Sequence, residues 1–388
     1  MKKLYCCIVV LVVVLNVAAW NSTAFSDWYI AHIFPLWVNT YGRLTGIFPF
    51  SVGEWLLAAG AVLVLMAAAL TVLRVCAGVK KAAGVFFRRF FLFFAWTLLS
   101  VSLVMTLNCF VLYHASTFSE QYFGEDSGEY SLVELIEVYN MVAEQCNGLS
   151  RVIARDGNGM AVYEGSQGDS GERLDMEDTA RKLMRELGRE YPQLEGYYPR
   201  PKALLSSDFM CQQHMQGYYF PFSMEANYND VMHILNFPAT MCHELAHLRG
   251  YIYEDEANFI SYLACTESED DFFRYSGYLS VLVYLNNDLY RAWKEENQVY
   301  EEAAAVVKPV AVEKQVWEDN IFVTQEEWDR INGKAWLDTD FVDKAADKFI
   351  DVNLKVNGIA DGKVSYSRVV RLLLQYYRKY PQKVRKNF

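Results

Sequence analysis

Uncharged apolar blocks dominate the first third of the chain, and shorter helical periods follow. Three stretches before residue 114 carry no charged side chain, namely residues 4–20, 55–73 and 90–113. A helix needs ~20 apolar residues to cross ~30 Å of hydrocarbon. The second and third stretches reach that length. We therefore predict transmembrane helices over about 4–20, 53–73 and 90–113.

The first of these stretches has two interpretations. It is the shortest, it follows Lys2 and Lys3, and it ends near the small residues Ala18 and Ala19, a pattern also found in cleaved signal peptides. We favour an uncleaved span. Cleavage would not change the orientation predicted below.

The remainder of the chain reads as a mainly α domain with a small sheet. Apolar residues recur with helical spacing over residues 238–249, 254–266, 269–294, 338–354 and 365–379. The aromatic stretch 215–229 favours β-structure, with Pro221 typical of an edge strand. We therefore predict a membrane region over residues 1–113, and an α+β domain over residues 114–388.

Charge divides the chain at the same place. Residues 1–113 contain only two acidic side chains, and residues 114–388 contain the other 45. Such an acidic domain argues against nucleic acid as a partner, because phosphate requires basic patches. The loop between the second and third predicted spans carries five basic residues, whereas the 21–53 loop carries only Arg43. The positive-inside rule therefore predicts a multi-pass protein of the cytoplasmic membrane, embedded in the lipid bilayer, with its C-terminal domain extracytoplasmic.

The cysteines of the outer domain leave their state open. Cys146, Cys211, Cys242 and Cys265 could form two disulfides in three pairings, or remain free buried thiols. No CxxC pair occurs in the sequence, so a thiolate zinc site has no support.

The strongest chemical signal is the stretch FPATMCHELAHLRG, residues 237–250. Pro238 suits the first turn of a helix, and Gly250 suits its end. His243 and His247 are four residues apart, so they project from one side of that helix and can share a tetrahedral Zn²⁺. Glu244 would lie beside the metal without binding it, placed to take a proton from water.

The third metal ligand is expected among the acids that follow Gly250. The order of residues resembles the gluzincin pattern, in which a second helix carries a glutamate ligand and, four residues later, an acid that supports the site. By that resemblance Glu254 is the ligand, and Asn258 stands where the family has Asp. Asn258 would fix the orientation of a ligating histidine. Glu256 is the alternative ligand, although it would lie about 200° away from Glu254 around the helix.

A wider resemblance covers most of the chain. The segments FPFSMEANYND, HELAHLRGYIYEDEANFISYLAC, YSGYL and VSYSRVVRLLLQYY resemble an uncharacterised family of bacterial membrane proteins, known as a domain of unknown function. Its members combine N-terminal spans with an HExxH zincin-like domain. The resemblance implies zinc metallopeptidase-like chemistry and supplies no substrate.

Four further residues are weaker candidates. Tyr275 or His214 could stabilise an oxyanion, although a packed aromatic ring and a solvated histidine are the commoner roles of such residues. Glu225 and Asn227 could line the substrate cleft, or they could be turn residues. The stretch around residues 217–225 could bind an extended peptide by edge pairing.

Together these features predict transmembrane helices followed by a mainly α (α+β) zincin-like domain. The expected function is hydrolysis of peptide bonds in a peptide or protein substrate outside the membrane, with Zn²⁺ as cofactor. The alternative is a non-catalytic zinc-binding sensor or scaffold at the cell surface. The presence of Glu244 favours an enzyme, because a structural zinc site needs no general base.

Overall fold

The computed structural model describes residues 2–76, 81–124, 130–164, 169–335, 337–356 and 366–385. The chain divides into two compact units. The first comprises Met1–Ser116 together with Phe220–Glu225, and the second comprises Thr117–Tyr219 and Ala226–Phe388. Each unit is described by itself.

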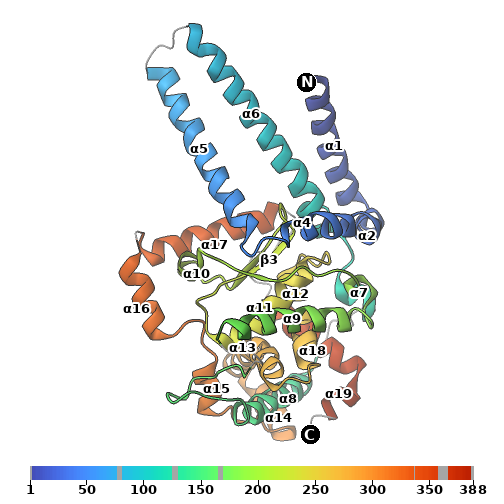
Figure 1. Ribbon diagram of the computed structural model, residues 1–388. Coiled ribbons are helices and arrows are strands. Elements are labelled where there is room, and N and C mark those ends of the chain that lie inside the picture. Colours follow the sequence, from blue (N-terminus) through green and yellow to red (C-terminus); the bar gives the residue numbers. More distant parts are fainter. Residues whose placement is uncertain are drawn as a thin grey trace. The chain divides into compact units, whose positions relative to one another are not determined.

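Long apolar helices form the first unit (Figure 1). Its elements are α1 (Lys2–Asn21), α2 (Thr23–His32), α3 (Phe34–Trp37), the π-helical turn η1 (Val38–Gly42), α4 (Arg43–Thr45), α5 (Val52–Cys76), α6 (Lys81–Met105), the π-helical turn η2 (Thr106–Phe110) and the 3₁₀ turn η3 (Leu112–His114).

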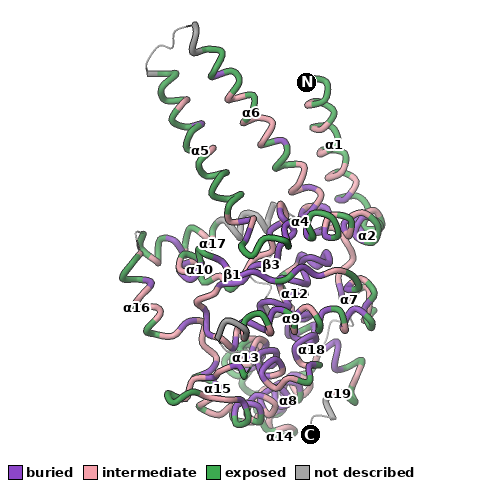
Figure 2. Tube along the Cα trace, viewed as in Figure 1, coloured by how far each residue is buried: buried purple, intermediate pink, exposed green. Residues whose placement is uncertain are grey.

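Among the described residues, three helices are long and apolar enough to cross a membrane. They span Lys2–Asn21, Val52–Val75 and Gly84–His114, and no more than 11% of each apolar window is buried within the protein. Figure 2 colours most of α1 and α5, and many residues of α6, as exposed. Exposed apolar surface of this extent is typical of contact with lipid, so the predicted spans are confirmed as candidate membrane helices.

A distant segment completes the first unit. Residues 220–225 are held there by three sets of hydrogen bonds. Thr45 Oγ1 donates to the Ser223 carbonyl at 2.7 Å, and Asn108 Nδ2 donates to the Pro221 carbonyl at 2.8 Å. The fully buried Glu225 carboxylate accepts from the backbone N–H groups at the start of α5 and from the Ser223 hydroxyl. An acidic group at this position satisfies helical N–H groups that have no partner within the helix.

The second unit is mainly helical, as predicted. Its helices are α7 (Phe118–Tyr122), α8 (Leu132–Ser150), α9 (Asp169–Leu187), α10 (Ser207–Gln212), α11 (Phe237–His247), α12 (Glu254–Thr266), α13 (Asp271–Glu295), α14 (Asn297–Val306), α15 (Lys314–Asp319), α16 (Gln325–Lys334), α17 (Thr339–Val356), α18 (Tyr366–Lys379) and α19 (Pro381–Arg385), with 3₁₀ turns at η4 (Pro192–Leu194) and η5 (Ile234–Asn236).

The described residues also form one small three-stranded sheet. Its strands are β1 (Lys202–Ala203), β2 (Gly217–Phe220) and β3 (Glu225–Tyr228), in the order β1-β3-β2. β1 and β3 run parallel, with Lys202 opposite Asn227. β2 is therefore an edge strand, and Pro221 lies in the turn that follows it rather than within a strand.

Helix α11 lies in the core of the second unit, packed against α9, α12 and α13 (Figure 1). Every residue of α11 except His243 is buried. Helix α12 in turn packs against α13 and α18, where Phe259 contacts Tyr376. The four cysteines of this unit are free and buried, which agrees with the thiol interpretation.

Candidate metal centre

The histidine pair stands on α11 as its spacing predicts. Pro238 lies in the first turn of the helix, and Gly250 follows its end with φ of 93°. Only a residue that tolerates the left-handed region makes that reversal without strain. The chain then turns back within a few residues, so that α12 begins at Glu254.

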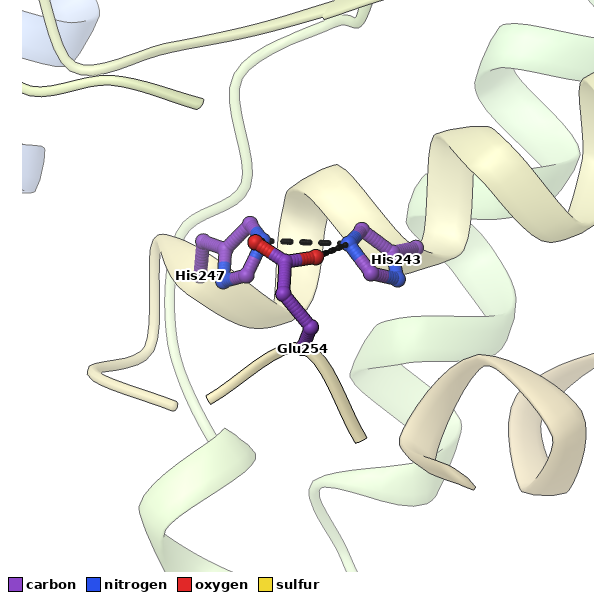
Figure 3. Close-up of side chains that lie close together, drawn as sticks. All are labelled: His243, His247 and Glu254. Atoms are coloured by element: carbon purple, nitrogen blue, oxygen red, sulfur yellow. Dashed lines mark hydrogen bonds and ion pairs between the residues drawn. The ribbon is translucent and has the colours of Figure 1, made fainter. Parts of the chain in front are cut away.

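Three side chains converge at this reversal (Figure 3). His243 Nε2 lies 3.1 Å from His247 Nε2 and 3.0 Å from Glu254 Oε2, and Glu254 Oε1 lies 3.9 Å from His247 Nε2. A tetrahedral ion held at ~2.0–2.1 Å separates its donor atoms by ~3.3 Å. The donor set and its spacing therefore suit a zinc ion.

The remaining ring nitrogens are held by acceptors. His247 Nδ1 donates to the Tyr251 carbonyl at 2.7 Å, and His243 Nδ1 donates to Asn258 Oδ1 at 2.8 Å. A proton on each Nδ1 leaves the lone pair on Nε2, which is the atom that faces the cluster. Asn258 therefore makes the contact that the sequence predicted for it.

The charges of the cluster influence one another. Burial alone would lower the pKa of His243, but its hydrogen bond and charge interaction with Glu254 raise it to about 9. The Glu254 side chain is 60% exposed; partial desolvation of its carboxylate would raise the pKa, but His243 and His247 together lower it to about 2. Burial lowers the pKa of His247 to about 4. Without a metal, His243 is therefore protonated and paired with the Glu254 carboxylate. A metal ion that binds both side chains would displace this proton.

Glu244 lies beside the cluster without joining it. Its side chain is 4% exposed, and burial raises its pKa to about 8. Its Oε2 atom is buried and has no hydrogen-bond partner among the described residues. A buried carboxylate oxygen without a partner is costly, so it is expected where a water molecule or substrate completes the site.

Glu256, the alternative ligand, points elsewhere. Its buried carboxylate accepts a hydrogen bond from the backbone N–H of Phe118 and does not belong to the cluster. Burial raises its pKa well above the usual value, which favours the neutral carboxyl.

The two glutamates give a matched test of the ligand assignment. Glu254→Gln should weaken zinc binding at least ~10-fold, because it removes a charged donor from the metal. Glu256→Gln should leave zinc binding nearly unchanged, because a neutral amide oxygen can still accept from Phe118. Competition with a coloured chelator measures both affinities. The opposite ranking would transfer the ligand role to Glu256.

The weaker candidates lie in other environments. The buried Tyr275 donates to Asp319 Oδ2 at 2.8 Å, and Asp319 is also paired with Arg155. His214 Nδ1 lies 2.9 Å from Asp343 Oδ1, on an exposed part of the second unit. These contacts give Tyr275 and His214 structural partners outside the cluster.

Of the two remaining candidates, Glu225 belongs to the first unit through its contacts with α5. The buried Asn227 donates weakly to the Tyr218 carbonyl within the sheet, at 3.3 Å.

Two residues near the cluster were missed from the sequence. The ring centroids of Tyr219 and His247 lie 6.1 Å apart, and Gly217 lies directly against Glu244. Both lie on edge strand β2, two residues apart and therefore on one face. A glycine within a β-prone stretch often marks a close approach, and this was the available signal.

Candidate membrane-spanning helices and a His–His–Glu cluster thus occur in one chain. The chain belongs to the family described as "Protein of unknown function (DUF3810)", whose model matches residues 29–374. No curated protein and no solved structure matches the chain.

Proposed function

We propose that the protein is a membrane-anchored, zinc-dependent peptidase. One observation above all supports the proposal: three atoms that could bind a metal converge beside the buried Glu244, whose Oε2 has no hydrogen-bond partner among the described residues. His243, His247 and Glu254 would hold the ion and leave one position open. Open positions distinguish catalytic from structural zinc sites.

The residues of the chain have distinct roles in this proposal. When bound, zinc supplies a Lewis acid that polarises the substrate carbonyl and orients the attacking water. Glu244 takes a proton from that water as the water oxygen attacks the carbonyl carbon. Glu244 then gives the proton to the departing amine nitrogen as the C–N bond breaks. A pKa near neutrality suits a group that both accepts and donates a proton.

The edge strand offers a place for the substrate. β2 has one neighbour in the described sheet, and Tyr219 on this strand lies beside His247. An extended peptide could pair with such an edge and present its backbone to the cluster. This favours a peptide or unfolded protein segment as substrate.

Metal removal tests the proposal directly. The full-length chain, purified in detergent, should contain about one zinc per chain. A chelator should abolish its hydrolysis of a mixture of quenched fluorescent peptides, and added zinc should restore it. Hydrolysis that persists in metal-free protein would contradict the proposal, as would a zinc-loaded protein that cleaves no peptide in the mixture.

The proposed location is the outer face of the cytoplasmic membrane, and a pair of glycines gives a matched test. Gly84 and Gly157 each have open space where a side chain would begin. In a chain whose Cys6, Cys7 and Cys76 are replaced by alanine, Gly157→Cys should react with a membrane-impermeant maleimide in intact cells. Gly84→Cys lies at the start of the third candidate span, in the first turn of α6 and between the basic residues Lys81 and Arg88. It should react only after lysis, because the positive-inside rule keeps this basic segment in the cytoplasm. The reverse pattern would place the second unit inside the cell.

A further inference from the structure

Gly217 stands where a side chain has no room. A Cβ atom built at this position would lie 2.7 Å from Glu244 Oε1 and 3.0 Å from Glu244 Cγ. It would also lie 2.6 Å from the Asn227 carbonyl oxygen of the neighbouring strand. Such distances are shorter than van der Waals contact, so any larger residue must displace Glu244 or the strand.

Backbone conformation does not explain this glycine. Gly217 belongs to strand β2 and is not among the glycines with positive φ. Alanine or any other residue could therefore adopt its backbone angles. The close approach of Glu244 on one side and of the Asn227 carbonyl oxygen on the other remains as the reason for the missing side chain, since glycine within a strand often marks such an approach.

Gly217 lies on the edge strand β2 and against Glu244, so this strand runs beside the candidate metal centre. The side chain of Tyr219, two residues further along β2, lies on the same face and beside His247. One face of the strand thus contacts both the carboxylate and a metal-binding histidine. On this face, only the position opposite Glu244 lacks a side chain.

We propose that Gly217 is a positioning residue for Glu244, an inference that rests on the proposed function. By leaving the space open, it allows the carboxylate to stand beside the cluster of His243, His247 and Glu254 that would hold the metal. A side chain at residue 217 would collide with the Glu244 carboxylate and with the Asn227 carbonyl oxygen, and it would push the carboxylate away. The three atoms nearest to the added Cβ include none of His243, His247 or Glu254, so we expect these three side chains to stay in place. The metal would then bind normally, but without the neighbouring base.

The test uses Co²⁺ in place of zinc, because cobalt gives a visible spectrum that reports on its surroundings. The full-length chain in detergent is loaded with Co²⁺, and the spectrum is followed as a function of pH. Glu244→Gln should shift the midpoint of this profile by ~1 pH unit, because groups around a metal tune the acidity of its water. Gly217→Ala should bind Co²⁺ as the wild type does and shift the midpoint in the same direction.

Two further variants make the test specific. Gly148→Ala is the matched control, because a Cβ atom there meets nothing within 4 Å, and it should leave the profile unchanged. In the Glu244→Gln background, Gly217→Ala should cause no additional shift, because the interaction it disturbs is already lost. An equal shift in both backgrounds would overturn the proposal, as would a wild-type profile for Gly217→Ala.

A variant that fails to fold would still be informative. If Gly217→Ala binds no Co²⁺, adding Glu244→Ala removes the side chain with which the new methyl group collides. Recovery of Co²⁺ binding in the double variant would support the proposal, and continued failure would assign the clash to the Asn227 carbonyl and overturn it. The Co²⁺ profile needs no substrate. Absence of peptide hydrolysis in the wild type would therefore contradict the proposed function alone.

Discussion

Glu244→Gln should abolish peptide hydrolysis while the protein keeps its zinc and its fold. Glutamine has the shape of glutamate but cannot accept the proton of the attacking water, and general-base catalysis typically contributes ~10²–10⁴-fold to the rate. Glu244 does not belong to the candidate metal cluster, so its replacement should separate the proposed chemistry from metal binding. We expect kcat to fall by ~10²-fold or more, measured with fluorescent peptides beside zinc analysis.

Glu256→Gln is the matched control for this substitution. Glu256 is also a buried glutamate of the second unit, but it contacts Phe118 rather than the cluster. The Glu256→Gln variant should therefore hydrolyse peptides at close to the wild-type rate. If Glu244→Gln protein supports full function in cells, the hydrolytic interpretation is wrong, and a zinc-binding sensor or scaffold becomes the better description.

Loss of the two histidines should remove the metal. His243→Ala and His247→Ala should each weaken zinc binding by more than the ~10–100-fold typical of an outer-shell partner, and the double variant should carry no zinc. Each substitution deletes a donor atom that lies within 4.8 Å of the other two. Elemental analysis of the purified chain measures the zinc content.

His214→Ala provides the control for the histidine variants. It removes a histidine of the same unit whose ring contacts Asp343, so zinc should remain. Zinc bound at about one ion per chain in the double His243→Ala, His247→Ala variant would show that the metal site lies elsewhere.

Local patterns predicted the elements of the site well. Helix α11 depends on a short-range repeat, a proline in its first turn and a glycine after its end, all within fourteen residues of sequence. The spacing of Glu254 and Asn258 on α12 was equally local, and both side chains reach the histidines. The helices expected over 254–266 and 269–294 are confirmed for the same reason.

Residues whose environment depends on distant partners could not be placed from the sequence. Tyr275 contacts Asp319, His214 contacts Asp343, and Glu225 contacts the start of α5, all far away along the chain. Periodicity carries no information on such pairs. The roles predicted for these residues therefore stay predictions, and the structure adds Gly217 and Tyr219 as neighbours of the site.

The hydrogen bonds of residues 220–225 have a practical consequence for dissection of the protein. A soluble fragment that starts after the third spanning helix would keep Phe220, Phe222 and Glu225 but lose Thr45, Asn108 and the first turn of α5. A carboxylate without its N–H donors, and a Phe220 ring that no longer lies against Gly53, would favour aggregation of that fragment. Secretion of the second unit alone should therefore require a redesigned, polar hairpin turn between β2 and β3.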